Sequence, residues 1–268
     1  MSSLRARVKR LLHRSGWEFR KIESPPRFLT RTALETAMAA LISAQGRIRV
    51  VQIGANDGVV NDPLHDFLMK HRDQTEVLLV EPQPYLIPIL AGNYKNHPMH
   101  HIENLAIGEH GTLLLHTIDE RFWPECAAPY ADGWPAYRAP TGVTSSDREH
   151  VLRYLHRYYK GKLPAEDLIV TFPTECMPLN DLMERAGFAP PVDVLQVDCE
   201  GFDDEVLYHS ALERLKPKLI NFEETGLTPD RLAALSRVLI ELGYSLQSTG
   251  QDVLAIRDST SCANKAGP

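Results

Sequence analysis

The sequence predicts an α/β fold in which a largely parallel β-sheet is covered by helices on both faces. Short apolar segments of strand length alternate with helical segments over most of the 268 residues. Several of these short segments are apolar throughout, as expected for strands that are buried on both faces. The last two strand segments, within 244–257, flank Thr249 and Gly250, which predicts an antiparallel hairpin at one edge of the sheet.

Local patterns place the individual elements. A basic amphipathic helix is expected over 1–15, and a second helix over 30–44, ended by Gly46. The remaining helices are expected at 62–71, 85–94, 146–159, 204–215 and 228–242. The remaining strands are expected at 49–53, 76–81, 101–107, 112–117, 192–197 and 218–222. A strand-turn-helix unit is expected over 168–187.

These elements divide the chain into three parts. Residues 1–45 form a basic N-terminal helical extension, 46–258 the main domain, and 259–268 a flexible tail. Within the main domain, 119–165 is irregular and longer than an ordinary connection, which predicts an insertion or lid over a site. We expect the aromatic residues of this insertion to form its small core, with stacking on a sugar ring as the alternative; they are Trp123, Tyr130, Trp134 and Tyr137.

Composition excludes several classes of protein. No run of about 18 apolar residues exists, which argues against a transmembrane helix, and the basic start lacks the apolar region of a secretory signal. The four cysteines are scattered without a C-x-x-C pair, which favours free thiols and a cytoplasmic location. The net charge of −6 argues against a nucleic acid partner.

The basic side chains are concentrated at the start of the chain. Residues 1–31 carry nine of the 29 Lys and Arg side chains and two of the 35 carboxylates. We expect the basic helix to pack on the domain, with contact to a membrane surface or a partner as the alternative.

The strand over 49–53 runs into a glycine turn, with the sequence Gly54-Ala55-Asn56-Asp57-Gly58. Glycine lets a ligand lie against the backbone, and this edge of an open α/β sheet is where nucleotide-like ligands bind. The full G-x-G-x-x-G is missing, which disfavours a dinucleotide. A tight turn without a ligand is the alternative.

Polar residues follow three further strands. Glu81 ends the second strand, where a carboxylate can accept hydrogen bonds from a ribose diol. Asn104 and Ala106 follow the third strand, where they can border an adenine. Asp198 and Glu200 follow the strand over 192–197, and Glu223 follows the next strand. Such acids can supply a general base or hold a divalent ion, whereas Asp203, Asp204 and Glu205 are interpreted as the charged start of a helix.

Other catalytic motifs are missing. The sequence has no H-E-x-x-H cluster, no P-loop, and no nucleophile-elbow glycine pattern around Ser145 and Ser146.

Six motifs in order resemble the FkbM-type methyltransferases over about residues 46–257. The motifs are Ile53-Gly54-Ala55-Asn56-Asp57-Gly58, Asn61-Asp62-Pro63-Leu64, Val80-Glu81-Pro82, Asn104-Leu105-Ala106-Ile107, Val197-Asp198-Cys199-Glu200-Gly201-Phe202-Asp203 and Asn221-Phe222-Glu223. The resemblance implies a Rossmann-like class I methyltransferase fold with a seven-stranded sheet. It also implies that S-adenosylmethionine binds at the first turn.

Carried over by position, the resemblance implies that the first turn holds the methionine end of the cofactor. Glu81 would hold the ribose, Asn104 and Ala106 would border the adenine, and Asp198 would lie beside the departing methyl group. The sequence departs from many methyltransferases at Gln52, where an acid is common. The cofactor amine would then be met by Gln52, Asp57 or a backbone carbonyl.

The implied reaction is O-methylation of a hydroxyl on a sugar, a glycan or a secondary metabolite. Asp198 is the first choice of base, followed by Glu200 and Glu223, because an aliphatic hydroxyl is a weak nucleophile. A divalent metal is an alternative that we do not favour. Cys199 is interpreted as a small buried residue rather than a nucleophile. Two other classes remain open: a non-catalytic binding or scaffold protein, and a nicotinamide-dependent oxidoreductase.

Overall fold

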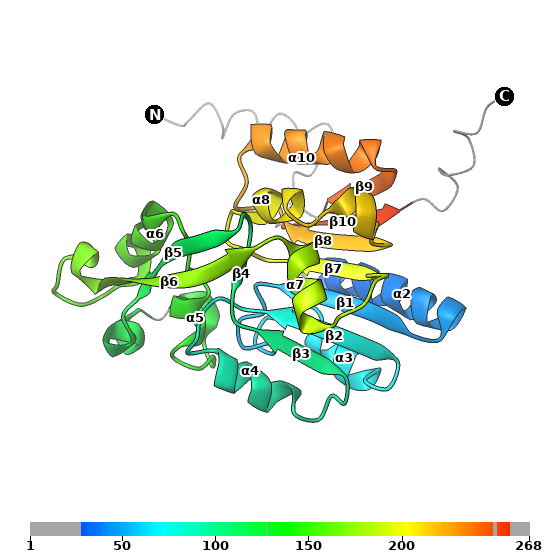
Figure 1. The fold of residues 1–268 in the computed structure, drawn as a ribbon. Coiled ribbons are helices and arrows are strands. Elements are labelled where there is room, and N and C mark those ends of the chain that lie inside the picture. The colour runs from blue at the N-terminus through cyan, green and yellow to red at the C-terminus, as the bar shows by residue number, and fades with distance from the viewer. Residues whose placement is uncertain (1–27, 127, 249–250, 258–268) are drawn as a thin grey trace, which may run out of the picture.

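The computed structural model describes residues 28–126, 128–248 and 251–257. A seven-stranded sheet with the order β3-β2-β1-β7-β8-β10-β9 forms its centre (Figure 1). The first five strands in that order are parallel, and β10 runs antiparallel to both β8 and β9. The strands are β1 (Ile48–Ile53), β2 (Thr75–Val80), β3 (His100–Glu103), β7 (Val194–Val197), β8 (Leu219–Glu223), β9 (Tyr244–Ser248) and β10 (Asp252–Arg257). The predicted fold class is confirmed.

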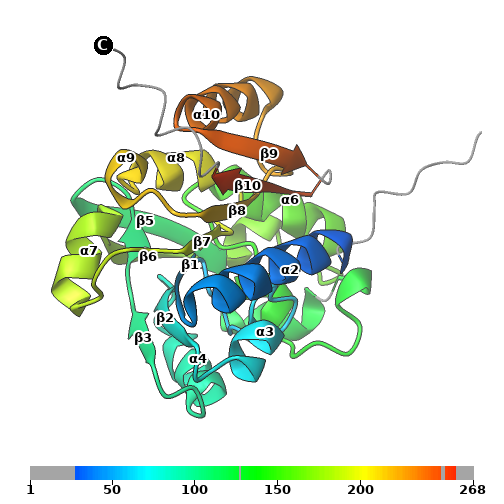
Figure 2. The same ribbon diagram turned by 90° about the vertical axis from the view of Figure 1, so that its right-hand side faces the viewer.

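Helices cover both faces of this sheet, as Figures 1 and 2 show. Because side chains alternate along a strand, Val50 packs in the cluster on one face and Val51 in the cluster on the other. The first face is covered by α2 (Phe28–Gln45), α3 (His65–Lys70) and α4 (Ile87–Tyr94). The second face is covered by α7 (Leu179–Ala186), α8 (Asp203–Tyr208), α9 (Leu212–Leu215) and α10 (Pro229–Glu241).

A second sheet lies beside the first, with the order β4-β6-β5. Its strands are β4 (Ala106–Ile107), β5 (Gly111–Ile118) and β6 (Ile169–Met177). The single strand expected over 101–107 is therefore wrong, because the chain leaves the main sheet after Glu103 and β4 pairs with β6. Asn104 marks the change, and its side-chain amide donates to the Glu81 carbonyl oxygen at 2.8 Å.

The segment between β5 and β6 has a hydrophobic core of its own, which includes Ile118, Val151, Leu155 and Leu168. Its elements are η1 (Glu120–Glu125), η2 (Pro129–Ala131), α5 (Arg138–Thr141), α6 (Arg148–Tyr158) and η3 (Ala165–Leu168). We call residues 119–168 the insertion. Trp123 and Trp134 pack against this core, in agreement with the expectation for them. Tyr130 differs, since 56% of it is exposed.

The other differences from the expected elements are local. The helix expected over 204–215 is broken into α8 and α9, because Ala211 has a left-handed φ of 47°. The helix expected from Asp62 begins later, since the Asp62 carboxylate accepts hydrogen bonds from the backbone N–H groups of Leu64 and His65.

Three of the expected segments cannot be compared with the structure. The basic helix over 1–15, the turn at 249–250 and the tail over 259–268 lie outside the described residues. Three described cysteines, Cys126, Cys176 and Cys199, are free thiols, as expected. None of the helices described is both long enough and apolar enough to cross a membrane.

Candidate functional site

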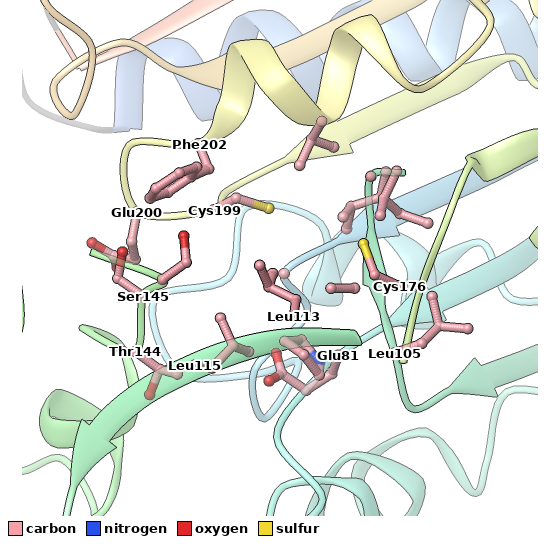
Figure 3. A pocket seen from close by; sticks show the side chains of 18 of the residues that line it. Glu81, Leu105, Leu113, Leu115, Thr144, Ser145, Cys176, Cys199, Glu200 and Phe202 are labelled. Atoms are coloured by element: carbon pink, nitrogen blue, oxygen red, sulfur yellow. The ribbon is translucent and has the colours of Figure 1, made fainter. Parts of the chain in front are cut away.

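A cavity of about 430 Å³ opens at the carboxyl ends of the main strands. The segments after β1, β2 and β7 line it from the main sheet, and β5 and the insertion line it from the other side. Figure 3 shows Leu113 and Leu115 on β5, and Cys199, Glu200 and Phe202 on the segment after β7, among the side chains around this cavity. Its size lies within the range of small-molecule sites.

Gly54 is required by the packing of two segments of the chain. Its φ is +80°, and a Cβ atom there would lie 1.9 Å from the carbonyl oxygen of Asp198. The turn after β1 therefore lies directly against the end of β7, and only glycine fits between them. This close approach brings Gly54, Asn56 and Asp198 to one cavity, which all three line.

The other predicted residues of this turn do not line the cavity. Gln52 is buried on the face of the main sheet that α2, α3 and α4 cover, where its amide donates to the Asp62 carboxylate at 2.5 Å. The carboxylate of Asp57 is occupied by the N–H groups of Val59 and Val60 and by a hydroxyl of the insertion.

Gly58 and Ala55 also face away from the cavity. A Cβ atom at Gly58 would lie 2.6 Å from Leu90 and 2.7 Å from Tyr94, so this glycine allows α4 to pack closely. Ala55 packs in the same hydrophobic cluster.

Glu81 is a buried carboxylate that lines the cavity directly after β2. One carboxylate oxygen accepts the backbone N–H of Asn56 at 2.7 Å. The other accepts the backbone N–H of Gln83 at 2.9 Å and its side-chain amide at 3.1 Å. Burial raises the pKa of Glu81, and these hydrogen bonds oppose that rise. Glu81 is thus held in place by backbone donors from two loops.

Of the two residues expected to border the adenine, one lines the cavity and the other does not. Ala106 lines the cavity. Asn104 does not, because its amide is bound to the Glu81 carbonyl oxygen and fixes the end of β2. Leu105 and Ile107, next to Ala106, add apolar surface to the same part of the cavity.

Four carboxyl groups gather at the ends of β7 and β8. Asp198 and Glu200 line the cavity, whereas Glu223 does not. Burial and the charges of Asp198 and Glu200 raise the pKa of Glu223 to about 8. Glu223 therefore binds its proton more tightly than an exposed glutamate does.

Asp203, the fourth carboxyl group, is fully buried. Its two oxygens accept the backbone N–H of Glu223 at 3.1 Å and of Cys199 at 3.3 Å. Burial, together with the charges of Asp198 and Glu223, raises its pKa well above the usual range. Asp203 thus connects the segment after β7 to the end of β8, in addition to its expected place in the first turn of α8.

The insertion supplies polar groups whose contacts sequence analysis did not predict. The Tyr137 hydroxyl donates to Asp57 at 3.1 Å, and the backbone oxygen of Thr141 accepts the Gln83 amide at 3.1 Å. His150 on α6 lies 3.4 Å from Glu200, and burial lowers the pKa of His150. Sequence analysis named Tyr137 only as an aromatic residue of the insertion, and no motif pointed to Thr141 or His150.

Two further observations concern chemistry at the cavity. Burial, reinforced by neighbouring carboxylates, raises the pKa of Cys199 well above its usual value, so the thiol is not activated as a nucleophile. Among the described residues, no group of three or more His, Cys, Asp or Glu side chains has the arrangement of a metal site.

The sequence model for the methyltransferase FkbM domain matches residues 52–246. No curated protein matches the chain in a sequence search.

Several solved structures resemble the chain at low sequence identity. One is a precorrin-6Y C5,15-methyltransferase from Geobacter metallireducens, at 11% identity, with 79% of this chain and 81% of that chain covered and a TM-score of 0.38. A second is a TehB-like SAM-dependent methyltransferase from Corynebacterium glutamicum, at 12% identity, with 94% of each chain covered and a TM-score of 0.35. A third is the CurJ carbon methyltransferase, at 11% identity, with 85% and 54% covered and a TM-score of 0.42.

Proposed function

Because this chain belongs to the FkbM methyltransferase family, we propose that it methylates a hydroxyl group of a small acceptor with S-adenosylmethionine as donor. The acceptor class is a sugar, a glycan or a secondary metabolite. The observation that carries the proposal is Glu81, a buried carboxylate that lines the cavity next to the turn after β1.

The hydrogen bonds of Glu81 fit a ribose. A carboxylate offers about four acceptor positions, and three are used by Asn56 and Gln83. One position is therefore free for a ribose hydroxyl. The Gln83 side-chain amide donates to Glu81 and to the Thr141 carbonyl oxygen, each at 3.1 Å. If this amide keeps only the Thr141 contact, a second acceptor position on Glu81 becomes free. Glu81 can then hold both hydroxyls of the ribose.

The rest of the cofactor fits the remaining lining of the cavity. Ala106, with Leu105 and Ile107, offers an apolar surface for the adenine. Gly54 and Asn56 form the wall next to Asp198, where the sulfur would lie. Gln52 and Asp57 do not reach the cavity, so the cofactor amine needs a backbone carbonyl instead.

S-Adenosylmethionine, when bound, supplies a methyl group that an acceptor oxygen can attack. The oxygen gains the carbon as the carbon–sulfur bond breaks, and the hydroxyl proton must pass to a base. Asp198 is the proposed base, because it lines the cavity beside Gly54. Glu223 does not line the cavity, and its raised pKa makes it a less available proton acceptor, so it is the weaker candidate. Alignment of donor and acceptor by the cavity walls contributes the remaining rate enhancement.

The test is calorimetric titration with S-adenosylhomocysteine. Glu81→Ala should weaken its binding about a hundredfold, because two charge-assisted hydrogen bonds are lost. Glu76→Gln is the matched control, since Glu76 lies at the opposite end of β2 and pairs with Arg49; its affinity should match that of the unchanged protein.

Absence of binding by the folded, unchanged protein would contradict the proposal and favour a scaffold protein. Binding of a nicotinamide dinucleotide instead would favour an oxidoreductase. Equal affinity of the Glu81→Ala variant and the unchanged protein would remove Glu81 from the ribose site.

A further inference from the structure

Arg138 is a cation that the insertion places in the wall of the cavity. It is the first residue of α5, it lines the cavity, and only 11% of its side chain is exposed. Its Nε donates to the Val60 carbonyl oxygen at 2.9 Å. The guanidinium carbon lies over the Trp134 ring, 5.7 Å from the ring centre. These two contacts fix the group next to the loop that follows β1.

The charge of Arg138 is only partly compensated by the described residues. The nearest carboxylate oxygen belongs to Asp57 and lies 3.9 Å from Nε. That oxygen already accepts the N–H groups of Val59 and Val60, and the other oxygen accepts the Tyr137 hydroxyl. Within the described part of the chain, neither terminal nitrogen of Arg138 has a hydrogen-bond acceptor. Four N–H donors therefore remain on a nearly buried cation.

We propose that Arg138 binds the α-carboxylate of the methionine end of the cofactor. The inference rests on the proposed function. Two parallel N–H groups of a guanidinium match the two oxygens of a carboxylate, and burial strengthens such a pair. Asp198 and Glu81 make the rest of the cavity wall acidic, so Arg138 supplies the compensating positive charge.

This assignment makes the insertion part of the cofactor site. The turn after β1 and Glu81 come from the main sheet, whereas Arg138 comes from α5 between β5 and β6. A bound carboxylate would therefore connect the two parts of the molecule, and the cofactor would strengthen the contact between them.

The test compares two ligands that differ at the methionine end. S-Adenosylhomocysteine carries the carboxylate, whereas 5′-methylthioadenosine keeps the adenosine and the thioether and lacks the amino acid group. Arg138→Gln should weaken binding of S-adenosylhomocysteine about tenfold or more. Its affinity for 5′-methylthioadenosine should change by less than about twofold, because the carboxylate contact is missing there. Isothermal titration calorimetry measures both.

Two further variants complete the design. Arg138→Lys keeps the charge and loses the paired hydrogen bonds. It should therefore weaken binding of S-adenosylhomocysteine by a smaller factor than Arg138→Gln does, and leave binding of 5′-methylthioadenosine unchanged. Arg153→Gln is the control, because Arg153 lies in the same insertion, is largely exposed and pairs with Asp147; it should bind both ligands as the unchanged protein does.

Equal weakening of both ligands in the Arg138 variants would give Arg138 a purely structural role and overturn the inference. Unchanged affinity for S-adenosylhomocysteine would overturn it as well, as expected if Arg138 served an anionic acceptor. Failure of the unchanged protein to bind either ligand would instead reject the proposed function.

Discussion

The main sheet and the insertion contribute to the same cavity in different ways. The main sheet contributes carboxylates such as Glu81 and Asp198 and also a close backbone contact, since the turn after β1 packs against the end of β7 with room for glycine alone at position 54. The insertion has its own core and reaches the sheet edge through side chains, among them Tyr137, Arg138 and His150.

This difference has a physical consequence. A contact made by the backbone cannot be changed without moving two strands, so a substitution there affects folding. A contact made by a side chain can be removed while both cores stay intact. We therefore expect a change in the backbone contact at Gly54 to alter stability strongly, and changes of side chains around the cavity, such as Arg138, to alter ligand binding with small effects on stability.

The largest expected effect is that of Gly54→Ala. The new Cβ atom would lie 1.9 Å from the Asp198 carbonyl oxygen at a φ of +80°, so β1 or β7 must move. We expect a loss of more than about 3 kcal/mol in the free energy of unfolding, measured by denaturant titration.

Gly46→Ala is the matched control for this prediction. Gly46 has a φ of +81° but no atom within 4 Å of the added Cβ. It should lose only the about 1–2 kcal/mol of a left-handed backbone. If both variants lose the same amount, the close approach at Gly54 does not constrain the fold.

A smaller effect is expected for Glu223→Gln, and it should depend on pH. The pKa of Glu223 in the folded protein is about 8, above the ordinary value for an exposed glutamate. Its protonated form therefore stabilises the fold at low pH, and this stabilisation is lost as pH rises toward and through 8. The Gln variant cannot ionise, so it should exceed the unchanged protein in stability by at least about 2 kcal/mol at pH 9, because each unit of pKa difference corresponds to about 1.4 kcal/mol.

Thermal unfolding at pH 5 and pH 9 measures this difference. The two proteins should differ little at pH 5, where Glu223 is protonated. A Gln variant that is less stable than the unchanged protein at pH 9 would show that the Glu223 carboxylate is stabilised rather than repelled by its neighbours.

The smallest expected effect is that of Tyr137→Phe, which removes one hydrogen bond between the insertion and Asp57. We expect a loss of about 1 kcal/mol in the free energy of unfolding. Tyr85→Phe is the control, because Tyr85 is 47% exposed and packs against the Trp123 ring in the same aromatic group. A loss of several kcal/mol for Tyr137→Phe would mean that the insertion is a structural part of the sheet edge.

The sequence predicted the main sheet well because each of its elements has a local signal. Gly54, Glu81 and Asp198 each follow directly after an apolar strand that is buried on both faces. The structure places these three residues around one cavity. The sequence predicted the local role of Asn104 less well. An amide after a strand can face a ligand or the backbone, and here it binds the Glu81 carbonyl oxygen.

By itself, the sequence determined the α/β fold, the motifs that follow the strands, and the family to which the chain belongs. Only the tertiary structure decided which side chains share the cavity. Periodicity reports which face of its own element a residue occupies, and it carries no information about distant segments. Arg138 and Glu81 are 57 positions apart and lie in the insertion and in the main sheet respectively, so their place around one cavity follows from packing alone.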